Sequence, residues 1–245
     1  MTYEEIVTFW QEQRIRTGEG LIRAIGEQGV LNAYHSGRIE NPAITFENTK
    51  EIFLNDSVSN YTGDIKTLFE IRNARDAHEL FLVSFGKRRV LDEAMILTFH
   101  LALNQNTYDK RRLEVGERPG TYKQHDYVTG KFDVGAAPED VHEEIEELLL
   151  ELKDITPDEV LTAAAYFHAK FENIHPFADG NGRVGRLMMN YLLIIHDYPP
   201  LIIFEEDRGG YYAALEAWDE KQDLEPLKAF LRTQTVKTWE GAAKR

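Results

Sequence analysis

The sequence predicts a predominantly α-helical protein with one small β-hairpin, and three observations support this fold class. Apolar residues recur at steps of three or four along most of the chain, which is the period of an amphipathic helix. Only residues 118–137 break this period, with glycine, proline and β-forming residues. The chain has 245 residues, of which 42% are hydrophobic and 29% charged, as expected for a globular protein with a buried core.

The clearest helix signal covers residues 157–174. Thr156 precedes Pro157 at the first helical position, and Glu159 is placed to close a capping box. The apolar positions of this stretch are Val160, Ala164, Phe167, Phe171 and Ile174. The proline that follows His175 disfavours helical geometry for His175, so the helix should end there.

Other stretches with the helical period are 64–84, 91–104, 138–152, 182–196, 208–220 and 224–240. A further amphipathic stretch contains Leu21, Ile22, Ile25, Val30 and Leu31. We expect one compact domain, in which residues 1–85 form an N-terminal helical lobe and residues 86–245 the main core. The Thr129-Gly130 pair lies between two short β-prone runs and predicts the turn of the hairpin.

Composition excludes several classes of protein. The formal charge of −14, from 42 acidic and 28 basic residues, disfavours nucleic-acid binding and requires a local cluster of positive charge if the ligand is an anion. The chain contains no apolar run long enough to span a membrane, and its start does not resemble a signal peptide. The absence of cysteine suits a reducing compartment, so a cytoplasmic protein is expected.

One short segment carries the residues for phosphate chemistry: His175, Asp179, Gly180, Asn181, Gly182, Arg183 and Arg186. The Gly-Asn-Gly turn permits positive φ and leads into a helix whose free N–H groups can bind an anion. Two arginines three residues apart lie on neighbouring positions of that helix and suit phosphate oxygens. With a carboxylate and an imidazole beside them, this set indicates phosphoanhydride chemistry.

Residues 175–186 resemble the Fic family signature, His-Pro-Phe-x-(Asp/Glu)-Gly-Asn-Gly-Arg-x-x-Arg, at every specified position. The resemblance implies the helical Fic fold and transfer of AMP from ATP to a Ser, Thr or Tyr hydroxyl of a protein. By that resemblance His175 is the general base and Asp179 holds Mg²⁺. The amides of the Gly-Asn-Gly turn hold the diphosphate, Arg183 neutralises the leaving pyrophosphate, and Arg186 binds the γ-phosphate.

Outside this segment the resemblance implies further binding residues. Tyr211 and Tyr212 resemble a tyrosine pair near the adenine, while Asp219 stands where the family often has Asn. The hairpin resembles the flap that aligns the target segment by strand addition. Its implied target-binding residues are Val128, Thr129, Gly130 and Lys131.

The N-terminal part also resembles a subclass of the family that carries an inhibitory helix. Residues 36–41 fit its pattern, (Ser/Thr)-x-x-x-Glu-(Gly/Asn). Ser36 and Glu40 are four residues apart and would share one helix face. The resemblance implies that Glu40 pairs with Arg186, occupies the position of the γ-phosphate, and tilts ATP into an unproductive pose.

Alternative functions remain open at this point. Relatives transfer UMP, phosphocholine or phosphate, although the intact Gly180 and Asn181 argue against the phosphate branch. Glu40 could instead orient a water molecule for removal of AMP. A nucleotide-sensing binding module is the non-enzymatic alternative, and it would not require His175 as a base. The family resemblance also implies possible self-modification and a possible homodimer.

Overall fold

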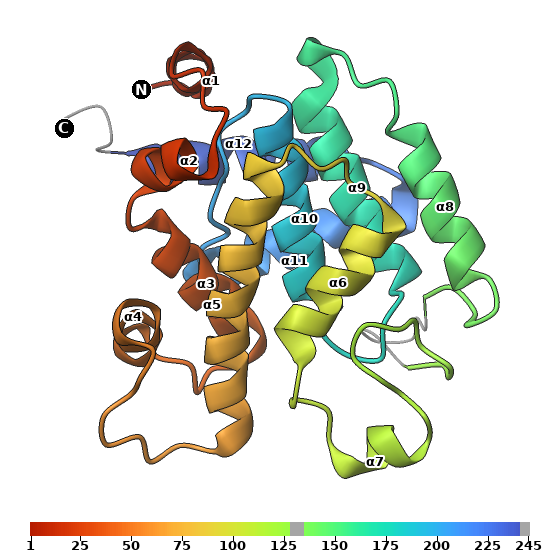
Figure 1. The fold of residues 1–245 in the computed structure, drawn as a ribbon. Coiled ribbons are helices and arrows are strands. Elements are labelled where there is room, and N and C mark those ends of the chain that lie inside the picture. The colour runs from red at the N-terminus through yellow and green to blue at the C-terminus, as the bar shows by residue number, and fades with distance from the viewer. Residues whose placement is uncertain (128–134, 241–245) are drawn as a thin grey trace.

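The computed structural model describes residues 1–127 and 135–240, and there the chain forms helices and no strand (Figure 1). The α-helices are α1 (Tyr3–Glu12), α2 (Gly18–Ile25), α3 (Gln28–Glu40), α4 (Phe46–Asn55), α5 (Ile65–Gly86), α6 (Glu93–Asn104), α7 (Lys110–Glu114), α8 (Val141–Glu151), α9 (Val160–Ile174), α10 (Asn181–Ile195), α11 (Arg208–Lys221) and α12 (Glu225–Trp239). Two short 3-10 helices precede α9 and α11.

The helices predicted from the apolar period are confirmed, with boundaries shifted by a few residues. The amphipathic stretch before Ser36 is divided into two helices, because Gly26 adopts a positive φ of 51° after α2. A left-handed φ at this position interrupts the helical path and lets α3 start in a new direction. The predicted boundary near residue 85 stays a prediction.

The predicted β-hairpin is not supported. Its turn, Thr129-Gly130, lies outside the described residues, and the described residues on either side of it form no strand. The buried carboxylate of Glu117 accepts hydrogen bonds from the Gln124 backbone N–H (3.0 Å) and the Tyr127 hydroxyl (2.9 Å). The first of these bonds uses a backbone N–H that a strand would offer to a partner strand.

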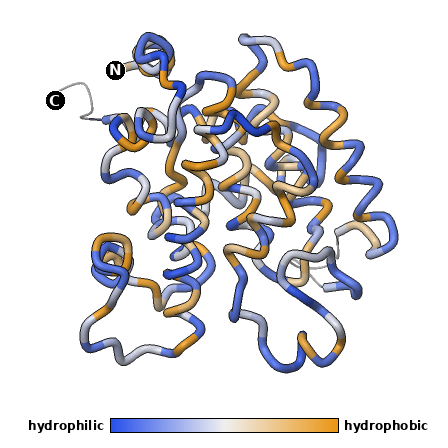
Figure 2. Tube along the Cα trace, viewed as in Figure 1, coloured by the Kyte–Doolittle hydropathy of each residue, from blue (hydrophilic) through white to orange (hydrophobic). Residues whose placement is uncertain are grey.

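The centre of the molecule is the pair α9 and α10, which α3, α5, α6, α8, α11 and α12 surround (Figure 1). Hydrophobic residues are concentrated along the central helices, and hydrophilic residues along the outer helices and loops (Figure 2). The loop between α9 and α10 therefore joins two helices that lie in the hydrophobic core. No helix within the described residues is long and apolar enough to cross a membrane.

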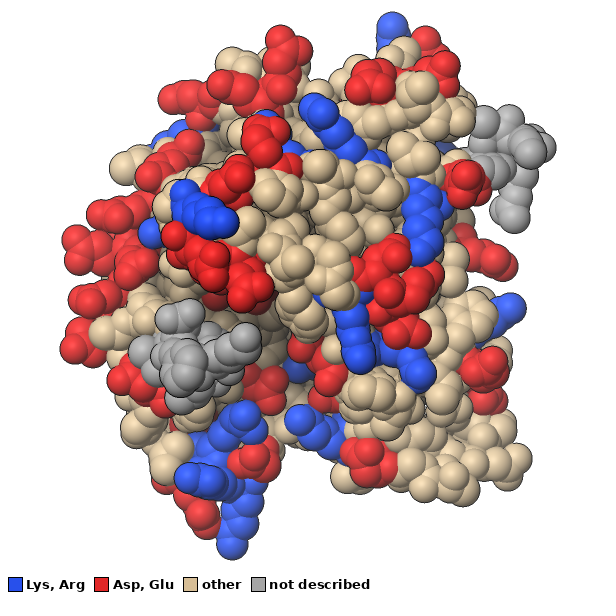
Figure 3. Space-filling view, turned by 180° about the vertical axis from the view of Figure 1, so that it is seen from behind, with Lys and Arg blue, Asp and Glu red and all other residues tan. Residues whose placement is uncertain are grey.

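The surface matches the acidic composition. Figure 3 shows acidic side chains over much of one face, whereas lysine and arginine form smaller groups. A site for an anionic ligand thus depends on the few places where the fold gathers cations.

Candidate active site

The loop that carries the predicted site begins where α9 ends. The predicted capping box at Thr156, just before α9, is present, and the Thr156 backbone N–H donates to Glu159 (3.2 Å). At the other end His175 adopts φ 50° and ψ 61°, and its N–H donates to the Phe171 carbonyl (3.0 Å). The prediction that the helix ends at His175 is confirmed, and this left-handed turn directs the chain into the loop.

The side chain of Asn181 fixes the shape of this loop. Its Oδ1 accepts from the Phe177 backbone N–H (2.9 Å), and its Nδ2 donates to the Phe177 carbonyl (2.8 Å). Both residues are buried, and Phe177 anchors the loop in the core. The side chain of Asn181 is therefore occupied within the protein, and only its backbone amide is placed for a ligand.

His100 on α6 holds the loop in place, a role that was not predicted from the sequence. Its Nδ1 accepts from the Gly120 backbone N–H (2.8 Å), so the proton is on Nε2, which donates to the Asp179 carbonyl (3.0 Å). The imidazole stacks on the Phe177 ring with centroids 3.6 Å apart. Burial lowers the pKa of His100 to about 4, so the ring remains neutral and keeps this pattern near neutral pH.

The first turn of α10 forms an anion-binding surface. Gly180 has a φ of 86°, and a Cβ atom there would collide with the Asn104 side chain, so glycine is required. Asn104 also accepts a hydrogen bond from Arg183 Nη2 (2.9 Å). The helix has no side-chain cap at this end. Its free N–H groups and its dipole therefore favour a bound anion.

The Asp179 carboxylate is partly exposed (25%) and lies among three cations. The distances are 3.7 Å from Oδ1 to Arg183 Nη2, and 3.8 Å from Oδ2 to both Lys66 Nζ and Arg112 Nη2. All three N···O distances are longer than a hydrogen bond, so the carboxylate oxygens of Asp179 remain accessible to a ligand. An accessible carboxylate beside a phosphate-binding turn fits Mg²⁺, which takes one or two protein carboxylates and completes its shell with phosphates and water.

The fold also brings Glu40 to Arg186, residues that are far apart in the sequence. Arg186 Nη2 donates to Glu40 Oε1 (2.8 Å) and to the Ser36 carbonyl (2.9 Å), and Nε donates to Ser36 Oγ (3.0 Å). The Arg186 side chain is only 3% exposed, whereas that of Glu40 is 40% exposed. The buried guanidinium thus faces a carboxylate that reaches it from the protein surface.

Part of this chain is similar in sequence to a known protein family. Residues 90–193 match the Fic/DOC family. These residues form a Fic/DOC family domain. Over 75 residues the chain is 48% identical to protein adenylyltransferase Fic of Drosophila persimilis, a stretch that covers 31% of this chain and 15% of the fly protein. Over 222 residues it is 28% identical to protein adenylyltransferase Fic of Drosophila erecta, covering 89% of this chain and 42% of that protein.

Solved structures show the same fold. A Fic domain containing signaling protein from Bacteroides thetaiotaomicron has a TM-score of 0.79 and 22% identity, covering 99% of this chain and 96% of that chain. Fic-1 from C. elegans, residues 134–508, has a TM-score of 0.76 and 24% identity, covering 99% and 73%. The chain spans less than half the length of the two fly relatives.

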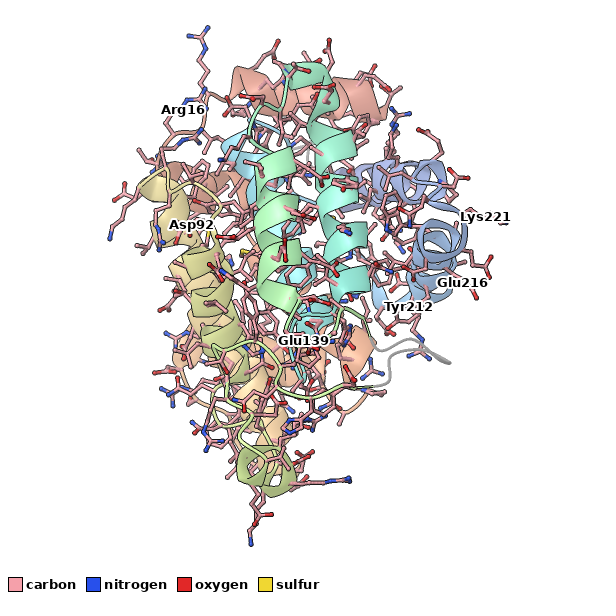
Figure 4. All side chains as sticks on the ribbon, turned by 90° about the vertical axis from the view of Figure 1, so that its right-hand side faces the viewer. Arg16, Asp92, Glu139, Tyr212, Glu216 and Lys221 are labelled. Carbon is pink, nitrogen blue, oxygen red and sulfur yellow. The ribbon has the colours of Figure 1, made fainter. Side chains whose placement is uncertain are left out.

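The two tyrosines predicted near the adenine lie in different environments. Tyr211 is 1% exposed, and its hydroxyl lies 2.7 Å from His168 Nε2 and 3.5 Å from Arg186 Nη1. Its phenol therefore supports Arg186 from inside the protein. Tyr212 is 47% exposed and projects from α11 near the end of α9 (Figure 4). On the same helix, Asp219 accepts a hydrogen bond from Asn173 (3.0 Å). Of the pair, only Tyr212 presents its ring at the surface.

The ring of His175 offers one unprotonated nitrogen. Burial lowers its pKa to about 4, the charge of Lys123 acts in the same direction, and a hydrogen bond to the backbone of Glu172 opposes them. The bond to that carbonyl uses one ring N–H, so the other nitrogen of the neutral imidazole is an acceptor. The predicted base is thus in its unprotonated form at neutral pH.

The segment predicted as a flap is attached to this Fic loop at both described ends. The Lys123 backbone N–H donates to the Pro176 carbonyl (2.9 Å), and that of Ala136 donates to the Ile174 carbonyl (2.9 Å). The predicted target-binding residues 128–131 lie outside the described residues. Their neighbours on both sides are nevertheless bonded next to His175.

Proposed function

We propose that this protein is a Mg²⁺-dependent adenylyltransferase, which transfers AMP from ATP to a Ser, Thr or Tyr hydroxyl of a protein and releases pyrophosphate. The observation that carries the proposal is the convergence, on one rigid loop and helix, of a neutral His175, an accessible Asp179 and an uncapped helix N-terminus with two buried arginines. The names of the relatives that match this chain support the same reaction.

The proposed steps follow from the positions of these groups. His175 takes the proton of the target hydroxyl as its oxygen attacks the α-phosphorus, and the bond from that phosphorus to the bridging oxygen of pyrophosphate breaks. The amides at the start of α10 and the Arg183 guanidinium stabilise charge on the phosphates. Asp179 would hold Mg²⁺, which supplies further neutralisation of the phosphates. We assign residues 128–131 to alignment of the target segment beside His175.

The resting protein is proposed to be autoinhibited by Glu40. A Cβ atom on Gly182 would collide with Glu40 Oε1, so this carboxylate lies directly against the first turn of α10. It is therefore at the end of the helix that favours an anion, and it is bonded to Arg186. Glu40 thus occupies a position proposed for a phosphate of ATP, which keeps the activity of the wild-type protein low.

Intact-protein mass spectrometry after incubation with Mg²⁺ and ATP tests the proposal. The Glu40→Gly protein is expected to gain the mass of one AMP by self-modification or to label an added protein mixture. The double variant Glu40→Gly, His175→Ala should do neither. If Glu40→Gly neither labels itself nor any protein with any nucleotide, the proposed activity is wrong.

Two other reactions of the same site remain as alternatives. The donor could be UTP, and a panel of radiolabelled nucleotides distinguishes it, because transfer from UTP but not ATP would replace our first assignment. Removal of AMP is favoured by the exposed edge of the Glu40 carboxylate, which could orient a water molecule. Release of AMP from a previously modified protein by wild type, but not by Glu40→Gly, would establish that reaction. A nucleotide-sensing module without catalysis would bind ATP and leave it unchanged.

Replacing Tyr211 with phenylalanine tests the support of Arg186. In the Glu40→Gly background we expect KM for ATP to rise by roughly 2–10-fold with little change in kcat, because one hydrogen bond to the γ-phosphate arginine is lost. Tyr198→Phe is the matched control, since it loses a hydroxyl bond to the Pro157 carbonyl (2.8 Å) away from the site. Equal KM values for the two variants would show that Tyr211 has no such role.

A further inference from the structure

Three cations from three separate elements surround Asp179, and only Arg183 belongs to the Fic motif. Lys66 comes from the first turn of α5, and Arg112 from the short helix α7. Both lie 3.8 Å from the same oxygen, Oδ2. In a chain with a formal charge of −14, this convergence is a local exception that needs an explanation.

The positive and negative charges of this cluster are equal in number only while no metal ion is bound to Asp179. Lys66 also lies 3.6 Å from Glu70, and Arg112 Nη1 donates to Asp109 (2.9 Å). Three cations thus face three carboxylates. A divalent cation on Asp179 would add two positive charges and take Asp179 away from Lys66 and Arg112. The cluster would then lack two negative charges, which a phosphate chain can supply.

Arg112 has unused hydrogen-bonding capacity in this arrangement. Its Nε is buried and has no partner among the described residues. Asp109 fixes the guanidinium, and the ring of Tyr108 lies beneath it with its centroid 5.9 Å from Cζ. A guanidinium that is already oriented loses little conformational entropy when it binds phosphate.

Lys66 can leave its present partners without leaving the buried carboxylate of Glu70 without a hydrogen bond. Glu70, which is buried, keeps a hydrogen bond from Asn41 Nδ2 (2.6 Å) when the ammonium group moves away. The Lys66 side chain is about half exposed, so its Nζ is free to turn toward a ligand.

We propose that Lys66 and Arg112 bind the pyrophosphate portion of the Mg²⁺-nucleotide, so that the phosphate site extends from the Fic motif to α5 and α7. This inference rests on the proposed function, because it requires a metal-nucleotide at Asp179. It gives the acidic chain the cluster of positive charge that an anionic substrate needs.

Binding of Mg²⁺-ADP, measured by calorimetry without turnover, tests the inference. With Glu40→Gly as the parent, Lys66→Gln and Arg112→Gln are each expected to raise Kd by roughly tenfold, the loss expected for a charge-assisted hydrogen bond. The matched controls are Arg72→Gln on α5 and Arg111→Gln on α7. Arg72 pairs with Asp76 (3.9 Å), and Arg111 is exposed beside Arg112. Both controls should bind as the parent does.

A conservative variant and the affinity for a metal ion distinguish phosphate binding from simple neutralisation of Asp179. Lys66→Arg should bind Mg²⁺-ADP within about threefold of the parent, because a cation remains at the site. If Lys66→Gln and Arg112→Gln bind Mn²⁺ more tightly but ADP unchanged, the two residues merely neutralise Asp179 and the inference is wrong. A parent that binds no ADP at all would overturn the proposed function as well, which distinguishes the two failures.

Discussion

Replacing His175 with alanine in the Glu40→Gly protein is expected to lower AMP transfer by a factor of about 10²–10⁴, the usual contribution of a positioned general base. The imidazole is set by the left-handed turn at the end of α9 and by its bond to the Glu172 backbone. Alanine retains neither the acceptor nitrogen nor any group that could replace it. Single-turnover transfer of labelled AMP measures the loss.

Binding and pH dependence show whether this loss is chemical. Mg²⁺-ADP should bind His175→Ala as it binds the parent, since none of the proposed phosphate contacts is made by the imidazole. Burial lowers the pKa of His175 to about 4, and a base must be unprotonated to act. The rate should therefore not change through this group between about pH 6 and 8, and should fall only as the pH drops toward the pKa. A His175→Ala rate equal to that of the parent would remove His175 from the mechanism.

The parts of the site that could be predicted from the sequence are contiguous or have strong local signals. His175 through Arg186 is one run of residues, and prolines mark both the start of the preceding helix and its end. The structure places that run as a loop and helix at the centre of the fold. Local sterics determine such boundaries, so they can be read without knowledge of the tertiary structure.

The supporting residues could not be predicted, because their roles depend on contacts between distant segments. The period of residues 91–104 indicates that His100 is on a helix, but not that its Nε2 donates to the Asp179 carbonyl, 79 residues later. Neither Lys66, in the predicted helix 64–84, nor Arg112 has a sequence signal that links it to Asp179. Only the packing of α5 and α7 beside the loop brings them to Asp179.

Tyr211 and Tyr212 are adjacent in the sequence but differ in burial, which a motif match alone does not predict. Successive side chains on an α-helix point in directions about 100° apart. Tyr211 therefore enters the core under Arg186 while Tyr212 faces outward. The prediction placed both rings at the nucleotide, and the buried position of Tyr211 follows from which face of α11 packs on α9.

Replacing Glu40 with glycine is expected to raise AMP transfer by roughly tenfold or more. The Arg186–Glu40 contact is a charge-assisted hydrogen bond, a class worth about 1.5–3 kcal/mol. The lower end applies because the Glu40 side chain is 40% exposed and partly screened by solvent. Glycine removes the carboxylate from the first turn of α10 and leaves Arg186 for ATP. Initial rates of AMP transfer at matched protein concentrations test this expectation.

Two control variants separate the loss of charge from a change in helix stability. Glu40 is the last residue of α3, and glycine has a low helix propensity. Part of the increase in rate with Glu40→Gly could therefore come from a less stable helix end. Glu40→Gln keeps the length and helix propensity and removes the charge, and it should give most of the activation. Ser36→Ala removes only the bond to Arg186 Nε (3.0 Å) and should activate less. Rates of Glu40→Gly and Glu40→Gln that both equal the wild-type rate would contradict the autoinhibition.

The dependence on ATP concentration shows how Glu40 inhibits. If Glu40 only competed with the γ-phosphate for Arg186, saturating ATP would displace it and the two proteins would reach the same kcat. Glu40 bonds Arg186, whereas the start of α10 has no side-chain cap and the Arg183 guanidinium bonds Asn104 and not Glu40. ATP can therefore bind through its other phosphates with its γ-phosphate displaced, which misplaces the α-phosphorus relative to His175. We accordingly expect the difference between wild type and Glu40→Gly to persist at saturating ATP, as a difference in kcat.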